Sequence, residues 1–256
     1  MKRNLLAATA AIATALGLSA CSYNESLGRS QLLLVNDASL VSAGQQAWAQ
    51  SLATGRISRN AAANERVRRV GQRIINAAGM GNQRWEYAVF ENNSPNAFAL
   101  PGGKIGVNTG LLALAPTDDQ LAAVIGHEVG HTAAHHAAER MSQQTATQIG
   151  LGVATSALGG AAGADRARQL ASLGSVGAQV GVLLPFSRTH ELEADRLGVN
   201  YMKAAGYDPR QAVTLWEAMA ARSRSGAGGI LSTHPSDAQR IAALRQYIAS
   251  RGWGAI

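Results

Sequence analysis

The sequence has a single cysteine, Cys21, so an internal disulfide is impossible even in an oxidising compartment. Aromatic residues make up 5% of the 256 residues, and they are not interleaved with basic residues as single-strand nucleic-acid binding requires. Long apolar runs are also missing. Neither the run at 5–18 nor the Gly-, Ala- and Ser-rich segment 150–186 could comfortably cross a bilayer. These absences exclude a disulfide-stapled module and argue against a multi-span membrane protein or a nucleic-acid-binding protein.

The N-terminus has the layout of a secretory signal. Lys2 and Arg3 precede an uncharged Ala- and Leu-rich run, and the tetrapeptide Leu-Ser-Ala-Cys follows, ending at Cys21. This position resembles the bacterial lipobox, in which the cysteine is lipidated and becomes the first mature residue. Ser22 after it, rather than Asp, resembles the pattern sorted to the outer membrane. We therefore expect a lipoprotein signal peptide at 1–20 and a lipid-anchored tether at 21–40. The alternative is an ordinary cleaved signal with an incidental cysteine.

The charge is mildly positive and spread along the chain. Without the expected signal peptide, 21 basic side chains face 16 acidic ones, and the formal net charge is +5. The densest basic cluster comprises Arg66, Arg68, Arg69 and Arg73. We expect this cluster to be a solvated helix face or to contact anionic lipid, rather than nucleic acid. The remaining length suits one domain with a sizeable core, at 41–256.

A zinc-binding motif, His-Glu-Val-Gly-His, occupies 127–131. Residues four apart share one face of a helix, so His127 and His131 can bind one ion. Glu128 lies one residue further round, where its carboxylate can reach a water on that ion. The preceding residues fit a helix start, with capping side chains followed by an apolar stripe. The competing interpretation is a helix with solvent-facing histidines.

Catalytic zinc usually takes three protein ligands and leaves a fourth position for water. A third histidine at HExxHxxGxxH spacing is excluded, because those positions hold Ala134 and Ala137. A later acidic run instead offers Glu191 and Asp195, four apart on one helix face. We expect Glu191 to bind zinc and Asp195 to accept the outer N–H of a ligand histidine. Glu193 points away from Glu191 and should face solvent or an arginine. A solvated acidic face is the alternative for the whole run.

Three motifs, in this order, resemble metallopeptidase family 48, the group of HtpX-like, CAAX prenyl and Oma-type zinc endopeptidases. They are H-E-V-G-H-x-x-x-x-H at 127–136, S-R-x-x-E-x-E-A-D at 187–195 and S-T-H-P-S at 232–236. The segment N-A-F-A-L-P-G-G-K-I at 96–105 also resembles the strand and turn before the family's metal helix. The resemblance implies a gluzincin-type zinc metallopeptidase domain with one Zn²⁺ per chain. The membrane spans of the HtpX and CAAX branches are missing, so the similarity is greatest to the soluble, periplasm-facing lipoprotein branch.

Periodicity and turn residues predict an α+β fold that is mainly helical, with a small β-sheet beside the metal helix. Helices are expected at 41–55, 60–79, 109–115, 118–141, 188–205, 209–223 and 236–250. Strands are expected at 85–89, 96–100 and 105–107. The segment 150–186 has two interpretations. It is either a helical hairpin of small residues packed on the core or a mobile lid over the zinc cleft.

The expected chemistry divides between the ion and the side chains. Zinc held by His127, His131 and Glu191 would lower the pKa of its water and polarise a peptide carbonyl. Glu128 would take the water proton and pass it to the leaving amine. His234 is our candidate donor to the negative oxygen of the tetrahedral intermediate, because the resemblance puts the S-T-H-P turn beside the active site. It could instead fill the open zinc position in a resting state, or be a surface histidine.

Four other side chains have weaker assignments. Arg240 could orient the S-T-H-P turn or pair with Asp237. His135 is rotated away from the second histidine of the motif, so we leave it out as a ligand. His136 matches the family motif without an obvious metal direction, which suggests a structural hydrogen bond. His190 is expected behind the ligands or exposed.

The strand at 96–100 is a candidate substrate site. A peptide could add a strand to its edge at Asn96, Ala97, Phe98 and Ala99, through main-chain bonds that tolerate varied sequence. The alternative is a plain core strand, in which Phe98 only packs.

The function that these features favour is a zinc endopeptidase that acts on misfolded or unassembled cell-envelope proteins. We expect it on the outer membrane, facing the periplasm, anchored by lipid at Cys21. Its expected partners are protein or peptide substrates and the membrane. Nucleic acid is not expected, and an oligomer or an outer-membrane assembly partner is compatible with the sequence. The alternatives are a zinc-containing chaperone or assembly scaffold with latent proteolysis, and a zinc amidase acting on the cell wall. The intact Glu128 favours the endopeptidase.

Overall fold

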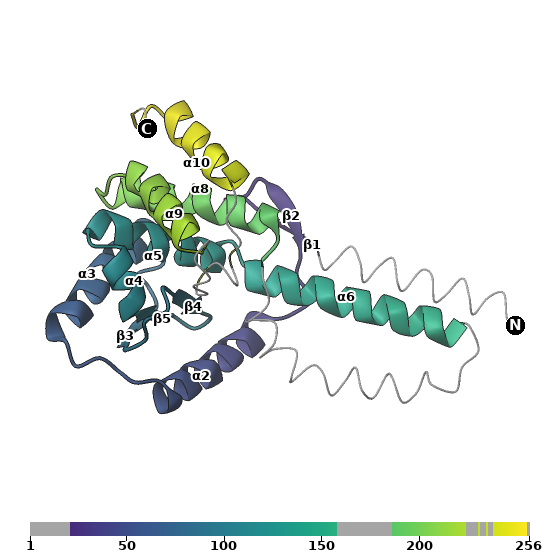
Figure 1. Ribbon diagram of the computed structural model, residues 1–256. Helices are drawn as coiled ribbons and strands as arrows, with labels where there is room; N and C mark the ends of the chain where they lie inside the picture. Colours follow the sequence, from purple (N-terminus) through teal and green to yellow (C-terminus); the bar gives the residue numbers. More distant parts are fainter. Residues whose placement is uncertain (1–20, 158–185, 224–229, 231–233, 235–237, 255–256) are drawn as a thin grey trace, which may run out of the picture.

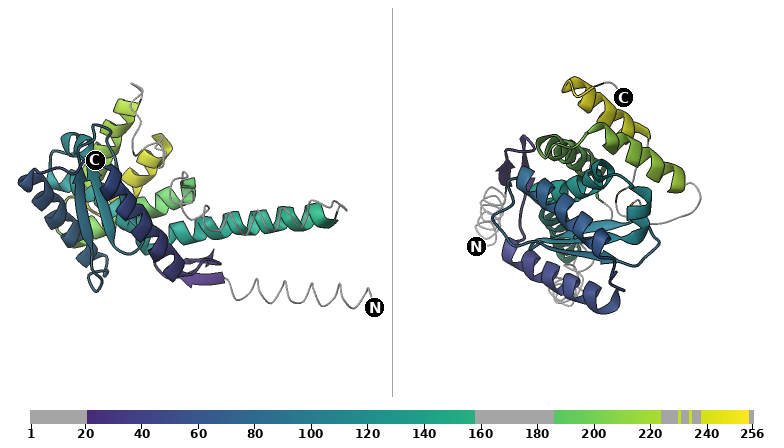
Figure 2. Two further views of the ribbon diagram at one scale, coloured as in Figure 1. Left: turned by 90° about the horizontal axis from the view of Figure 1, so that it is seen from below. Right: turned by 90° about the vertical axis from the view of Figure 1, so that its left-hand side faces the viewer.

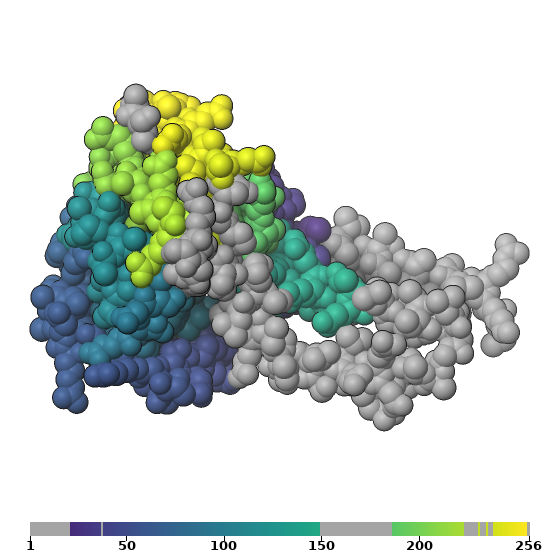
Figure 3. Space-filling model, viewed as in Figure 1, coloured from purple at the N-terminus to yellow at the C-terminus, as the bar shows by residue number. Residues whose placement is uncertain are grey.

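A computed structural model describes residues 21–157, 186–223, 230, 234 and 238–254. A small sheet lies between helix α2 (Asp37–Thr54) and a stack of other helices, and helix α6 (His136–Ala157) projects from the body (Figure 1). The left view of Figure 2 shows this projection from another side. In the space-filling view, α10 lies at one end of the body and α2 at the other (Figure 3). Within the described ranges, no helix is both long and apolar enough to cross a bilayer.

Three strands form the sheet: β3 (Glu86–Phe90), β4 (Ala97–Leu100) and β5 (Lys104–Asn108). Their order is β3-β5-β4, with β5 parallel to β3 and antiparallel to β4. Gly102 and Gly103 make the turn between β4 and β5, and both have the positive φ that glycine adopts without strain. Among the described strands, β4 is paired on one side only, so it is an edge strand.

The two faces of the sheet bury different cores, as the alternation of side chains along a strand requires. On one face, Phe90 and Leu100 pack with Trp48 of α2, and Phe98 is partly buried against them. On the other face, Val89 and Ile105 belong to the main core, to which most of the other helices contribute. The sheet therefore reaches the helical stack through one face and one edge.

Helix α5 (Asp118–Ala133) is the centre of the main core. A capping box of Thr117 and Gln120 starts it, and all residues from Leu121 to His131 are buried. The remaining helices are α3 (Ala61–Ala77), α4 (Thr109–Leu114), α8 (Arg188–Ala204), α9 (Arg210–Ser223) and α10 (Ala238–Ser250). Helix α5 packs against α3, α8, α9 and strand β4. The predicted α+β, mainly helical fold with a sheet beside the metal helix is confirmed.

The prediction of one helix over 118–141 is wrong, because α5 ends at Ala133 and α6 begins at His136. His135 has a φ of 54°, in the left-handed region, and it is the one described non-glycine residue with a positive φ. A left-handed residue cannot continue a right-handed helix, so the chain changes direction there. As a result, the His136 side chain contacts His131 of α5 instead of continuing that helix.

Residues 21–40 are more than a tether. Strands β1 (Cys21–Asn24) and β2 (Arg29–Leu32) form an antiparallel hairpin, and α2 begins at Asp37. The Gln31 side chain is buried, and its Nε2 donates to the Ala134 carbonyl oxygen at 2.8 Å. The hairpin is therefore packed on the end of α5.

The segment expected to be a lid or a helical hairpin is mostly residues 158–185. These residues lie outside the part of the chain that the structure describes.

Candidate metal centre

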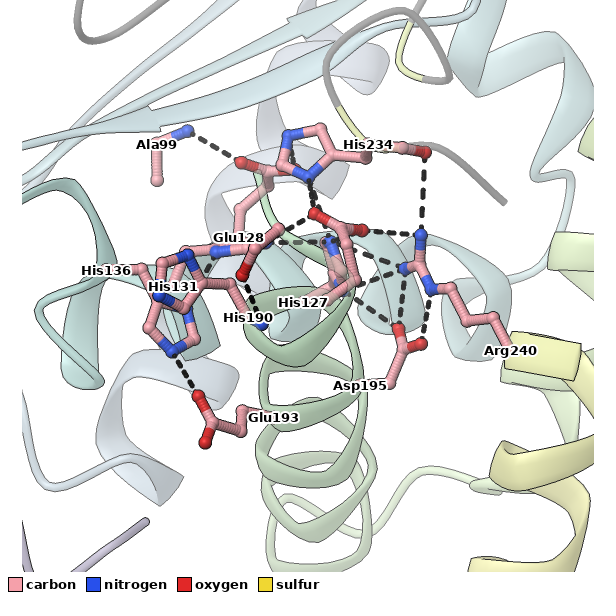
Figure 4. Close-up of polar contacts among 12 residues, drawn as sticks. Ala99, His127, Glu128, His131, His136, His190, Glu193, Asp195, His234 and Arg240 are labelled. Carbon is pink, nitrogen blue, oxygen red and sulfur yellow. Dashed lines mark hydrogen bonds and ion pairs between the residues drawn. The ribbon is translucent and has the colours of Figure 1, made fainter. Parts of the chain in front are cut away.

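Four buried side chains converge beside the sheet: His127, His131, Glu191 and His234. One possible ligand atom from each lies within 4.8 Å of the others. Figure 4 shows the three histidines of this group close together. The Nε2 atoms of His127 and His131 are 3.1 Å apart, and Glu191 Oε1 lies 3.3 Å from His131 Nε2. The structure thus brings together both motif histidines and the predicted glutamate, with His234 beside them.

Glycines allow the two ligand-bearing helices to approach this closely. A Cβ atom on Gly130 would lie 2.8 Å from the Ala194 carbonyl oxygen, and one on Gly126 would lie 3.0 Å from the Gly198 carbonyl oxygen. A Cβ atom on Gly198 would in turn meet the main-chain nitrogen of His127 at 2.9 Å. The main chains of α5 and α8 are therefore in contact, which places the first turns of α8 against the HEVGH segment.

Asp195 lies where the sequence predicts, behind His127. Its Oδ1 is 2.9 Å from His127 Nδ1, and because a carboxylate only accepts, the ring donates from Nδ1. The lone pair of His127 Nε2 then faces the ligand cluster. Arg240 holds Asp195 in place through two hydrogen bonds, from Nε at 2.5 Å and from Nη2 at 2.8 Å.

The electrostatics of the cluster require a cation or a proton. Although burial and Arg240 oppose it, Glu191 and Asp195 raise the pKa of His127 to about 9. Burial lowers the pKa of His131 well below its usual value. Two imidazole nitrogens 3.1 Å apart repel each other when both present lone pairs, unless a proton or a cation lies between them. A pair of histidines and a glutamate is also a known ligand set of catalytic zinc, so these residues fit a zinc ion.

Glu128 lies next to the ligand cluster but is not part of it. The side chain is buried, and its Oε2 accepts a hydrogen bond of 3.3 Å from the Ala99 main-chain nitrogen. Its Oε1 accepts no hydrogen bond from any described residue and lies 3.5 Å from His234 Nε2. Glu128 therefore connects the edge strand β4 to the candidate metal centre (Figure 4).

His234 is buried in the cluster and is not a surface histidine. Its Nδ1 lies 2.9 Å from Glu191 Oε1 and 3.2 Å from His127 Nε2. The ring therefore approaches the same point as the three predicted ligands, while Nε2 faces Glu128. The position of His234 is compatible with both roles that the sequence left open, a fourth metal ligand and a hydrogen-bond donor to the substrate.

Sequence reasoning missed most of the role of Arg240. The guanidinium is buried, lies 4.3 Å above the Trp216 ring and pairs with both Asp195 and Glu191. Its predicted alternative partner, Asp237, lies outside the described residues. An arginine five residues after the Ser-Thr-His-Pro turn was the only available signal, and it did not identify the carboxylates that Arg240 contacts.

The other histidines follow the helix break. His135 is exposed, in agreement with its exclusion as a ligand. His136 is buried, and its Nδ1 lies 2.9 Å from His131 Nδ1, which is the structural contact that the sequence suggested. His190 is buried and contacts Glu139 Oε2 at 3.2 Å. Glu193 is buried and faces Arg29, so the arginine-facing alternative applies rather than the solvent-facing one.

A helical HExxH site with a glutamate from a later helix defines the class of zinc-type metallopeptidases. A comparison with protein families agrees, because the family model of Peptidase family M48 matches residues 61–248. The chain therefore belongs to peptidase family M48, a family of metallopeptidases.

Three relatives illustrate the range of similar proteins. Mitochondrial metalloendopeptidase OMA1 of Schizosaccharomyces pombe is 41% identical over 184 residues, 71% of this chain and 52% of the relative. Metalloprotease LoiP of Escherichia coli is 29% identical over 70% of this chain and 69% of the relative. The Beta-barrel assembly-enhancing protease of Escherichia coli is 26% identical over 70% of this chain and 37% of the relative. The chain thus spans about half or less of the OMA1 relatives it matches.

Proposed function

We propose that this protein is a zinc-dependent endopeptidase in which His127, His131 and Glu191 hold the ion. The observation that carries the proposal is the convergence of two imidazole nitrogens and a carboxylate. Glu128 lies beside them, and its Oε1 has no hydrogen bond from any described residue. A chaperone or scaffold would need the fold, but it would not need a carboxylate in that position.

The side chains have separate tasks in the proposed reaction. When bound, zinc activates a water molecule and polarises the carbonyl of the peptide bond. The Ala99 N–H holds Glu128 by Oε2, which leaves Oε1 to take the proton of the attacking water and deliver it to the leaving amine. Asp195 keeps the Nε2 lone pair of His127 directed at the cluster. His234 Nδ1 lies beside the three ligand atoms, so it would hold the ion at rest as a fourth ligand. Turning the ring away would let Nε2 donate to the developing negative oxygen.

Removal of the ion provides the test of this proposal. We expect the purified protein to carry one zinc per chain and to cleave an unfolded substrate such as casein. A strong chelator should abolish cleavage, and one equivalent of Zn²⁺ should restore it, because no described side chain replaces the ion. Mg²⁺ serves as the control cation, since it prefers oxygen ligands. Cleavage that persists without metal would contradict the proposal. Metal-bound protein that only suppresses aggregation would favour the chaperone.

The proposed substrate site is the edge of β4 that does not pair with β5. Asn108 donates its N–H to the Asn96 carbonyl oxygen, and this pairing alternates along the strand, so Ala97 and Ala99 direct their main-chain groups away from β5. Phe98 instead bonds β5 through its main chain, and its ring packs 6.3 Å from Trp48 and 5.9 Å from Phe90. Phe98 therefore shapes the sheet. The contact with substrate falls to the main-chain groups of Ala97 and to the carbonyl oxygen of Ala99, because the Ala99 N–H is already bonded to Glu128.

Methylated substrates test this edge pairing without altering the protein. N-methylation of a peptide amide that bonds the edge should lower kcat/KM by about 2- to 12-fold, since a hydrogen bond contributes about 0.5–1.5 kcal/mol. The amides directly before and after it point away from β4 and serve as controls, so the effect should alternate along the peptide. An equal effect at every position would exclude strand addition.

We further propose that the chain acts in the bacterial cell envelope. Residues 1–20 would be the signal peptide, Cys21 the lipid acceptor, 21–40 the link to the membrane and 41–256 the metallopeptidase domain. Cys21 is exposed at the start of β1, which supports its access to modification. A relative named for β-barrel assembly supports substrates among misfolded or unassembled envelope proteins, and an outer-membrane assembly partner.

A further inference from the structure

The N-terminal hairpin contributes an arginine to a buried network behind the metal centre. Arg29 of β2 forms a forked pair with Glu193 of α8, from Nε at 2.6 Å and from Nη2 at 2.8 Å. It forms a second forked pair with Glu139 of α6, from Nη1 at 2.6 Å and from Nη2 at 2.9 Å. One guanidinium thus holds two carboxylates whose side chains are 5% exposed. Forked arginine–carboxylate bonds fix orientation as well as charge.

A chain of hydrogen bonds leads from this pair to a proposed zinc ligand. Glu193 Oε2 lies 3.0 Å from His136 Nε2, and His136 Nδ1 lies 2.9 Å from His131 Nδ1 (Figure 4). A carboxylate only accepts, so neutral His136 carries its hydrogen on Nε2 and offers a lone pair at Nδ1. His131 then donates from Nδ1, and its Nε2 lone pair faces the cluster.

The hairpin also holds the helix break that makes this chain of bonds possible. Gln31 Nε2 donates to the Ala134 carbonyl oxygen and, at 2.6 Å, to Glu139 Oε2. His190 contacts the same oxygen of Glu139 at 3.2 Å, and its ring is stacked on His136 at 4.4 Å. The ring of His136 is thus supported on its face by α8 and at its edge by Glu193.

We propose that the N-terminal hairpin is a functional part of the metal centre, with Arg29 as a positioning residue. Through Glu193 and His136, Arg29 sets which nitrogen of His131 carries the hydrogen and how the ring is oriented. Without Arg29, Glu193 would lose the two hydrogen bonds that fix its carboxylate from the other side and could rotate away from His136. This inference rests on the proposed zinc site, and it makes metal affinity depend on a segment far from the HExxH motif in sequence.

Metal affinity is the readout that tests the inference. We expect Arg29→Met to bind Zn²⁺ about 10-fold more weakly than wild type. This is the low end of the usual cost of losing an outer partner of a ligand histidine, because Arg29 acts on His131 through Glu193 and His136. Competition with a chromophoric chelator at neutral pH measures this affinity. The visible spectrum of Co²⁺-loaded protein, in which a turned His131 ring changes the band positions, is the second readout. Arg68→Met, which removes an exposed pair with Glu65, is the matched control and should match wild type.

Two further outcomes separate this inference from the proposed function. Arg29→Lys keeps the positive charge but cannot form the four forked bonds, so it should fold and still bind zinc several-fold more weakly. Wild-type affinity and Co²⁺ spectrum in Arg29→Lys would overturn the inference, even where Arg29→Met does not fold. A lower unfolding temperature with unchanged affinity would also overturn it, because Arg29 would then be structural only. Failure of wild type itself to bind metal would instead remove the proposed function.

Discussion

Replacement of Glu128 by Gln should lower peptide hydrolysis by about 10²- to 10⁴-fold, the usual contribution of a general base, while zinc stays bound. Glutamine has nearly the same shape and keeps an oxygen that can accept the hydrogen bond from Ala99. It cannot take a proton from water at neutral pH. Because Glu128 is not in the ligand cluster, the ion should be retained. Casein cleavage and metal content, measured on the same preparation, check both parts.

The exposed pair on α10 and α9 supplies a control for this substitution. Glu217 pairs with Arg245 on the surface, so Glu217→Gln makes the same chemical change away from the cluster and should leave cleavage unchanged. If wild type and Glu128→Gln both bind zinc and are equally inactive, the endopeptidase assignment is wrong and the scaffold is favoured. Release of cell-wall fragments without peptide cleavage would point to the amidase.

Spacing within a single element was enough to predict which candidate ligands share a helix face. His127 and His131 lie four apart on α5, and Glu191 and Asp195 lie four apart on α8, so helix geometry alone puts each pair on one face. Alternation likewise located the three strands, because each face of the sheet buries its own core. The structure brings the predicted ligands together, and the family confirms the class of enzyme.

Long-range and left-handed features could not be predicted in this way. His135 takes a positive φ for which no side-chain pattern is diagnostic, so the break between α5 and α6 was invisible in the helical period. Arg29 meets Glu193 across 164 residues, and nothing local to either residue indicates the other. Strands β1 and β2 have four residues each, too few for alternation along the sequence to indicate a hairpin in the segment expected to be a tether. These contacts depend on how complete elements pack.

Arg240→Met should destabilise the metal-free protein by about 3–5 kcal/mol, the usual cost of removing one partner from a buried ion pair. The arginine pairs with two buried carboxylates, Asp195 at 2.5 Å and Glu191 at 2.5 Å, and methionine would leave both without that charge. Methionine can still pack on Trp216, so the effect should come from charge rather than from a cavity. Urea unfolding in the presence of a chelator measures the free energy of unfolding.

A second arginine of α10, Arg245, is the matched control, because its pair with Glu217 is exposed and should contribute about 0–1 kcal/mol. The effect of Arg240→Met should also depend on pH. Although burial opposes it, Arg240 and His127 hold the pKa of Asp195 below its usual value of 3.8. The stability from this carboxylate is thus present above pH 3.8 and lost as the pH falls further, so the difference between wild type and Arg240→Met should shrink in acid. Equal losses for Arg240→Met and Arg245→Met would show that the buried charges are satisfied without Arg240, and Asp195 would then have to hold His127 unaided.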